Sequence, residues 1–178
     1  AGWSDAKVST PKMAALIADA LLPAPQIKTV DVASEGRCLI LGSAAVTLPA
    51  AERLAETLTV TVLLEEDEDL PLSRAFETVR GRMVGAEGTL GAFTVKIDAL
   101  QLLEPGGRGA FSLSLPRDGA RTECDIILDL SGRSSLFPAP HKRDGYLRAD
   151  PGSMPAVAEA VFQAAQHVGT FEKPLFLR

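Results

Sequence analysis

Continuous apolar runs, rather than alternating ones, mark the centre of the chain. The stretch from Arg37 to Glu66 begins with an apolar run at Cys38–Leu41, bends at the small residues Gly42–Ala45, and ends in a second apolar run at Leu58–Leu64. Strands that are apolar on both faces are typical of sheets that are covered on both sides. The pattern therefore predicts a strand–helix–strand unit in a parallel α/β sheet.

Three segments place apolar residues at helical spacing behind a capping residue and a proline. Proline is tolerated in the first helical turn because its missing N–H is not needed there. Thr47 is the predicted N-cap of the middle helix, and Ser153 that of the last. The predicted helices lie near residues 11–21, 48–57 and 153–167, and we expect all three to pack on the sheet.

Further strands are predicted from β-prone runs and the turn residues that separate them. Glu123–Leu130 is apolar enough for a third central strand, and residues 77–98 form an antiparallel hairpin around Glu87-Gly88. A weak strand is expected at Gln26–Val32 and a short edge strand at Ala110–Leu115. The predicted fold is one α/β domain over residues 1–169, with a mainly parallel central sheet flanked by helices, an inserted antiparallel hairpin, and an extended tail at 170–178.

Composition excludes several classes of function. The chain has 178 residues, a net charge of −5 and a pI near 5.1, which disfavours a nucleic-acid groove. Its apolar runs are too short for a membrane span, and the N-terminal segment lacks the pattern of a secretory signal. Cys38 and Cys124 are the only cysteines, so we expect a reduced, cytoplasmic protein.

No catalytic, cofactor-binding or metal-binding residues are predicted from motifs. The bend at Gly42–Ala45 lacks the glycine spacing of phosphate-binding loops, and the two cysteines lack the paired spacing of a metal site. Nucleophilic catalysis requires a nucleophile, a histidine base and an acid within reach of one another. The best available candidates are Ser134 or Ser135, His141 and Asp129, but a nucleophile-elbow motif is absent. The acidic run Glu65–Asp69 is interpreted as a solvated loop.

A basic segment gives the one candidate surface for a partner. Its members are His141, Lys142, Arg143, Tyr146 and Arg148. Such a segment suits an acidic partner, including a neighbouring domain of the same polypeptide. The alternative function is a small-molecule or nucleotide-binding α/β domain that uses the strand-end bends at Gly42-Ser43 and Ser131–Ser135.

The last third of the chain resembles a known family. Cys124–Leu130, Gly145–Leu147 and above all Val168–Leu175 are similar to the N-terminal extension of bacterial 4Fe–4S ferredoxin-type proteins. The glycine-rich hairpin Arg80–Phe93 fits the same family, and the likeness covers roughly residues 37–178.

This resemblance implies an accessory role in electron transfer. In that family, the segment that matches Phe171–Leu177 leads into cysteine-rich cluster motifs, none of which occurs before Arg178. The implied function is a non-catalytic accessory or docking domain of a 4Fe–4S electron-transfer protein, truncated before the cluster motifs. No cofactor is expected in these residues, whereas 4Fe–4S clusters are expected in the longer protein. The implied partners are a C-terminal cluster domain of the same polypeptide and a redox partner protein.

Overall fold

The computed structural model describes residues 6–22, 28–65, 70–105, 111–140 and 143–174. The chain divides into two compact units. The larger unit is Asp31–Glu172, and the smaller consists of Ala1–Val30 with Lys173–Arg178.

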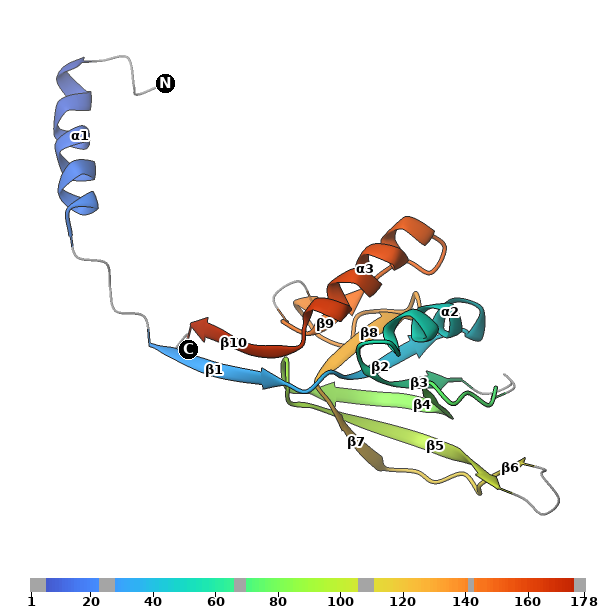
Figure 1. Cartoon of the computed structure of the whole chain (residues 1–178). Coiled ribbons are helices and arrows are strands. Elements are labelled where there is room, and N and C mark those ends of the chain that lie inside the picture. The colour runs from blue at the N-terminus through green and yellow to red at the C-terminus, as the bar shows by residue number, and fades with distance from the viewer. Residues whose placement is uncertain (1–5, 23–27, 66–69, 106–110, 141–142, 175–178) are drawn as a thin grey trace. The chain divides into compact units, whose positions relative to one another are not determined.

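A mixed eight-stranded sheet forms the body of the larger unit (Figure 1). Strands β2, β3, β4, β8 and β9 are parallel to their neighbours within this group, whereas β5 is antiparallel to β4, β6 and β7. The spatial order is β6-β5-β4-β3-β2-β8-β9, with β7 also paired to β5. The strands are β2 (Arg37–Gly42), β3 (Thr59–Leu64), β4 (Glu77–Glu87), β5 (Phe93–Pro105), β6 (Phe111–Leu113), β7 (Ala120–Cys124), β8 (Ile126–Leu130) and β9 (Tyr146–Arg148).

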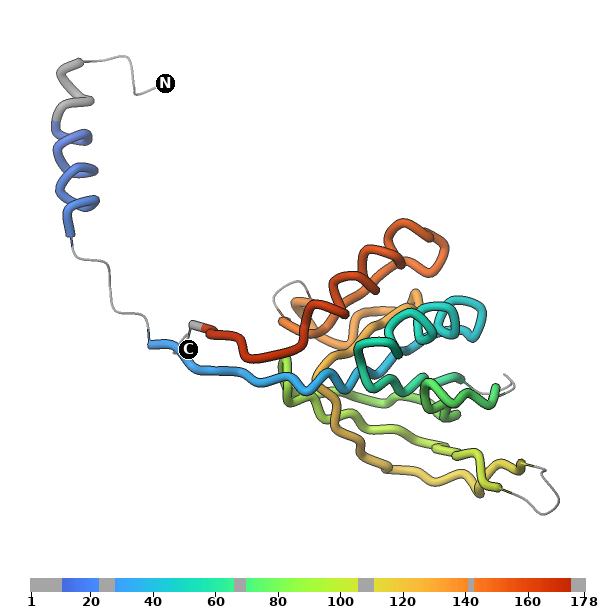
Figure 2. Tube along the Cα trace, in the orientation of Figure 1, coloured from blue at the N-terminus to red at the C-terminus, as the bar shows by residue number. Residues whose placement is uncertain are grey.

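The two apolar runs and the hairpin are found where the sequence predicts them. The runs form β2 and β3, and β4 and β5 form the antiparallel hairpin that extends the sheet. Figure 2 follows the chain from β4 through the turn into β5. Gly88 has a φ of +107°, and a Cβ there would lie 2.0 Å from the carbonyl oxygen of Ala92, so this turn requires glycine.

The predicted strand Glu123–Leu130 is wrong as a single strand. It is divided at Asp125 into β7, which pairs with β5, and β8, which pairs with β2. The Asp125 side chain is buried and accepts hydrogen bonds from backbone N–H groups beside β2, which fixes the chain at the change of partner. Apolar content alone does not reveal such a change.

Two helices cover one face of this sheet and lie beside each other: α2 (Ala44–Leu54) and α3 (Met154–Gln166). Helix α3 begins after Ser153 as predicted. Helix α2 begins earlier than predicted, after Ser43, so Thr47 is not its N-cap. Instead Thr47 is buried within the helix, and its hydroxyl donates to the carbonyl oxygen of Ser43 at 3.0 Å.

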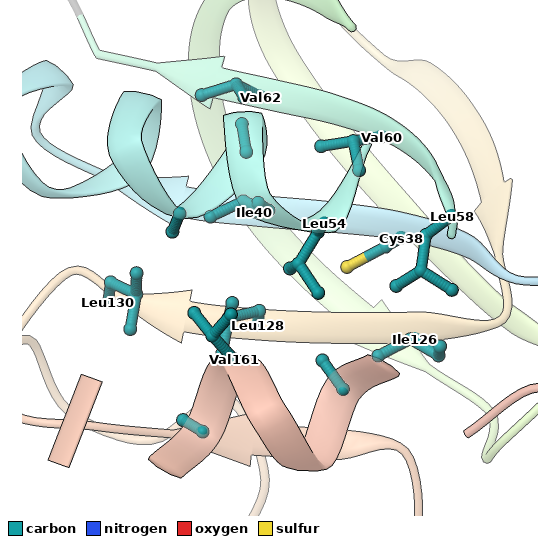
Figure 3. Close-up of a cluster of buried hydrophobic side chains, with 14 of the residues drawn as sticks. Cys38, Ile40, Leu54, Leu58, Val60, Val62, Ile126, Leu128, Leu130 and Val161 are labelled. Atoms are coloured by element: carbon teal, nitrogen blue, oxygen red, sulfur yellow. The ribbon is translucent and has the colours of Figure 1, made fainter. Parts of the chain in front are cut away.

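Alternate residues of the central strands form an apolar core beneath the helices (Figure 3). Each fully buried valine, leucine or isoleucine side chain stabilises the fold by about 1.5–3 kcal/mol through its removal from water. The core residues include Cys38, Ile40, Val60, Val62, Leu64, Ile126, Leu128 and Leu130 from the strands, with Leu54, Val157 and Val161 from the helices.

The opposite face of the central strands is also buried, but β-structure and a loop cover it instead of helices. Phe93 and Val95 of β5 pack there against Leu39 of β2, together with Phe137 from the segment between β8 and β9. The sequence therefore correctly predicts strands that are covered on both sides, whereas the expectation that helices flank the sheet holds for one face.

The smaller unit contains α1 (Ala6–Ala20) and the start of β1 (Thr29–Ser34). Helix α1 begins at Ala6, earlier than the predicted start at residue 11, so Pro11 lies inside the helix and not in its first turn. Within this unit, Met13, Leu16 and Ile17 of the apolar stripe are 54–57% exposed. Periodicity predicts such a stripe but not what covers it, and the expectation that this helix packs on the sheet of the larger unit stays a prediction. Strand β1 pairs with β10 (Gly169–Pro174), in the region where an extended tail is predicted.

Candidate functional site

The carboxyl ends of β2, β3, β8 and β9 lie at one edge of the parallel part of the sheet. Open α/β sheets bind ligands at this edge. Both predicted bends occur here, because Gly42-Ser43 follows β2 and Ser131–Ser135 follows β8. The side chains at this edge are therefore the first candidates for chemistry.

The Gly42 bend serves close packing of strand against strand. Gly42 has a φ of +144°, and a Cβ there would lie 2.7 Å from the carbonyl oxygen of Leu130 on β8. Ser43 is the N-cap of α2, yet its side chain makes no capping hydrogen bond. Glycine is required at this bend by the neighbouring strand.

A buried carboxylate, Asp129, organises the second bend. Asp129 is 2% exposed. Its Oδ1 accepts hydrogen bonds from the hydroxyl of Ser131 at 2.6 Å and from the Ser131 N–H at 3.1 Å. Its Oδ2 accepts a hydrogen bond from the Tyr146 hydroxyl at 2.6 Å and lies 3.4 Å from Nε of Arg148. Three donors and one cation thus compensate the charge that burial would otherwise make unfavourable.

Tyr146 acts as a hydrogen-bond donor in this cluster. Burial raises the pKa of Tyr146 to about 12, and its hydrogen bond to Asp129 acts in the same direction. The phenol therefore stays protonated at neutral pH. Its oxygen also accepts the N–H of Leu136 at 3.2 Å, which ties the segment after β8 to β9.

Ser135, unlike Ser131, is bonded within the loop, and no hydrogen bond joins it to Asp129 among the described residues. The Ser135 hydroxyl donates to the carbonyl oxygen of Phe137 at 2.8 Å and accepts the Phe137 N–H at 3.2 Å. Asp129 is bonded to Ser131 and Tyr146 instead, and no contact between Asp129 and Ser134 is seen among the described residues. His141, the base among the candidate residues for nucleophilic catalysis, lies outside the described residues. The hydrogen bonds that are present stabilise a turn.

Three of the five residues predicted to face a partner make contacts within the domain, and the other two are not described. Arg143 donates from Nη1 to the carbonyl oxygen of Gly88 at 2.8 Å, and its guanidinium lies 4.7 Å from the centre of the Phe137 ring. Tyr146 is buried, and Arg148 pairs with Asp129 while also donating to the carbonyl oxygen of Arg133. His141 and Lys142 lie outside the described residues.

A hollow of about 300 Å³ lies beside this cluster. Gly132, Arg148, Ala149 and Asp150 line it. It touches the second bend but does not reach the Gly42 bend. Arg133, next to Gly132, forms an ion pair with Glu65. Glu65 is the one residue of the predicted acidic loop that the structure describes. Glu66–Asp69 lie outside the described residues.

A second buried carboxylate, Asp125, is not predicted from the sequence. Asp125 is 1% exposed and accepts the N–H groups of Glu35 at 2.8 Å and Arg37 at 3.1 Å. Nη2 of Arg37 lies 2.8 Å from its other oxygen, and this bond raises the pKa of the Arg37 guanidinium. A charged residue within an otherwise apolar run is the signal that could have revealed it.

Both cysteines are free thiols near Asp125. Cys38 and Cys124 are buried and, together with Arg37, line a hollow of about 110 Å³. Burial raises the pKa of Cys124 to about 12 and also raises the pKa of Cys38. Thiols in this state are protonated at neutral pH, whereas metal ligands and nucleophiles are thiolates. Within the described ranges, no group of three or more His, Cys, Asp or Glu side chains could hold a metal ion.

Comparison with known proteins adds no assignment. No protein-family model matches the chain, and no curated protein matches it. Among the described helices, none is both long and apolar enough to cross a membrane.

Proposed function

We propose that this chain is a non-catalytic accessory or docking domain of a 4Fe–4S electron-transfer protein whose clusters are bound by other parts of the polypeptide. The proposal begins from the resemblance carried by Val168–Leu175 and the glycine-rich hairpin Arg80–Phe93. The domain would position the cluster domain against a redox partner through the segment 141–148, in which Arg148 is exposed whereas Tyr146 is buried. An assignment by resemblance requires independent support from the site.

The observation that carries the proposal is how the polar side chains at the carboxyl edge are used. Asp129 is bonded to Ser131, Tyr146 and Arg148, so the groups best suited to chemistry hold one loop to the sheet. An edge whose polar groups are bonded to one another suits a domain that presents a surface, because a surface binds best when it is ordered in advance.

The state of the cysteines supports placing the clusters elsewhere. Iron–sulfur clusters are held by cysteine thiolates, and a ligand must lose its proton to bind. Burial raises the pKa of both Cys38 and Cys124, which disfavours that step. The cysteines that bind iron would then belong to sequence outside these 178 residues.

The test compares this chain with the natural open reading frame that contains it, both expressed without oxygen. Visible absorption, iron content and acid-labile sulfide are measured for each protein. We expect a broad visible band that bleaches on reduction in the longer protein and neither iron nor sulfide in the 178-residue chain. Absence of iron from both proteins would end the iron–sulfur proposal, and stoichiometric iron in the short chain would place the cluster within it.

The 300 Å³ hollow favours one second candidate, a small-anion site at the Ser131–Ser135 bend. Its lining includes the cationic residue Arg148 and Gly132, together with Asp150. Titration of the isotopically labelled chain with inorganic phosphate tests this candidate. Saturable amide shifts at Gly132 and Asp150 would support it, whereas unchanged spectra at millimolar phosphate would exclude phosphate as the ligand.

A further inference from the structure

The antiparallel part of the sheet has an outer face that no described element covers. Along β5, Phe93, Val95 and Ile97 are buried, so the alternate residues Lys96 and Asp98 point to the opposite face. Strand β4 lies on one side of β5 and β7 on the other. Residues that are register partners across these strands share a face, which allows the surface to be mapped.

Cations gather at the middle of this outer face. Lys96 is the direct register partner of Arg121 on β7, and Arg82 on β4 is the partner of Asp98. Arg82, Lys96 and Arg121 are all exposed. The salt bridges found in the described residues involve Arg37, Arg133 and Arg148, not these three. Asp98 is partly engaged, because its Oδ1 accepts the N–H of Gly119 at 2.8 Å.

The direct pairing of Lys96 with Arg121 is unfavourable for the domain by itself. Like charges on opposite residues of neighbouring strands destabilise a sheet. The whole chain carries a net charge of −5, so a group of three cations is a local departure from its overall charge. An acidic partner would convert this repulsion into attraction, and such complementarity sets orientation and association rate.

Acidic residues and a bulge complete the surface. Glu87 and Glu123 are both brought to the same end of the face by pairing with Thr94. The pairing of β4 with β5 shifts between Met83 and Gly85, and the intervening Val84 is 50% exposed. A hollow of about 130 Å³, lined in part by Gly85 and Lys96, adjoins it. The face thus offers cations, an apolar contact and a recess together.

We infer that the outer face of β4, β5 and β7 around Arg82, Lys96 and Arg121 is a docking surface for an acidic patch of another protein. The acidic end at Glu87 and Glu123 would repel a continuous phosphate backbone, while it suits a protein surface that carries charges of both signs. This surface consists of other residues than segment 141–148, although Arg143 of that segment bonds to the carbonyl oxygen of Gly88, next to Glu87. The inference does not depend on iron–sulfur clusters.

The test uses the full chain, labelled with nitrogen-15 and titrated with a short poly-L-glutamate peptide at low salt. We expect saturable amide shifts confined to β4, β5 and β7 near the three cations, and weaker binding as salt rises. The variant K96E/R121E should bind about tenfold more weakly. The control R53E/R74E makes the same change in net charge at two other exposed positions and should bind normally.

A neutral variant guards against misfolding by charge reversal. K96T/R121T places β-prone threonine at both positions and should show intermediate affinity with an unchanged far-ultraviolet circular dichroism spectrum. Equal weakening in R53E/R74E would overturn the inference, as would shifts confined to other elements or no binding at low salt. If a single-stranded oligonucleotide binds more tightly and shifts the same amide resonances, the partner is a nucleic acid and not an acidic protein.

Discussion

Removal of a single hydroxyl, by Tyr146→Phe, tests how the buried Asp129 is held. The substitution keeps the aromatic ring but deletes the 2.6 Å bond to Asp129 Oδ2 and the acceptor for the Leu136 N–H. A hydrogen bond to a charged group contributes about 1.5–3 kcal/mol. We therefore expect the free energy of unfolding at pH 8 to fall by roughly 2 kcal/mol, measured by urea unfolding followed by circular dichroism.

The same substitution gives a pH dependence with a definite sign. The pKa of Tyr146 is raised from about 10 to about 12 in the folded state, and a difference of this size corresponds to roughly 2–3 kcal/mol. Because the folded pKa is the higher one, this stabilisation is present below pH 10 and is lost as pH rises through about 12. The difference in stability between the wild type and Tyr146→Phe should shrink over that range.

A spectroscopic titration measures the same quantity directly. Tyr146 is the only tyrosine in the chain, so the phenolate absorbance reports this residue alone. The band should appear near pH 12 in the folded protein and near pH 10 in urea, and Tyr146→Phe should show none. A folded protein whose phenolate forms near pH 10, or a stability difference that stays constant up to pH 12, would refute the reasoning.

Three further substitutions test other parts of the account by urea unfolding. Asp125→Ala should lower the free energy of unfolding by roughly 2–3 kcal/mol, because two backbone N–H groups lose their acceptor. The control Glu123→Ala, at an exposed position, should change it by less than about 0.5 kcal/mol. Equal effects of the two substitutions would refute the role of Asp125. Ala99→Gly should raise stability by up to about 1 kcal/mol, since Ala99 has a φ of +53°, and a loss would refute this strain. Gly42→Ala should cost roughly 2 kcal/mol or more because of its contact with Leu130, whereas Gly85→Ala, with nothing within 4 Å, should be nearly neutral.

Apolar patterning was sufficient for the strands and helices whose burial is local. The continuous runs of β2 and β3 indicate burial on both faces, and both faces are buried. The pattern could not reveal that Phe93 and Phe137 cover one of those faces, because both come from segments far along the chain. Packing partners are set by topology, which a single segment does not encode.

The buried polar groups mark where sequence reasoning fails for the site. Asp125 and Asp129 stand in an apolar run and look like strand-end residues, yet both are almost fully buried. Their partners, Arg37 for Asp125 and Tyr146 for Asp129, are distant in sequence. Tyr146 was predicted as part of a partner surface because its neighbours are basic, but its hydroxyl points to Asp129. Such pairs become visible only when the sheet brings them together.

The measurement that tests the proposed role most directly removes residues 31–172 from the complete natural protein. Iron and sulfide content, the reduction potential and the rate of electron transfer to its redox partner are compared with those of the intact protein. An accessory docking domain predicts unchanged clusters and potential together with slower transfer. Loss of the clusters, or transfer at the intact rate, would contradict the account.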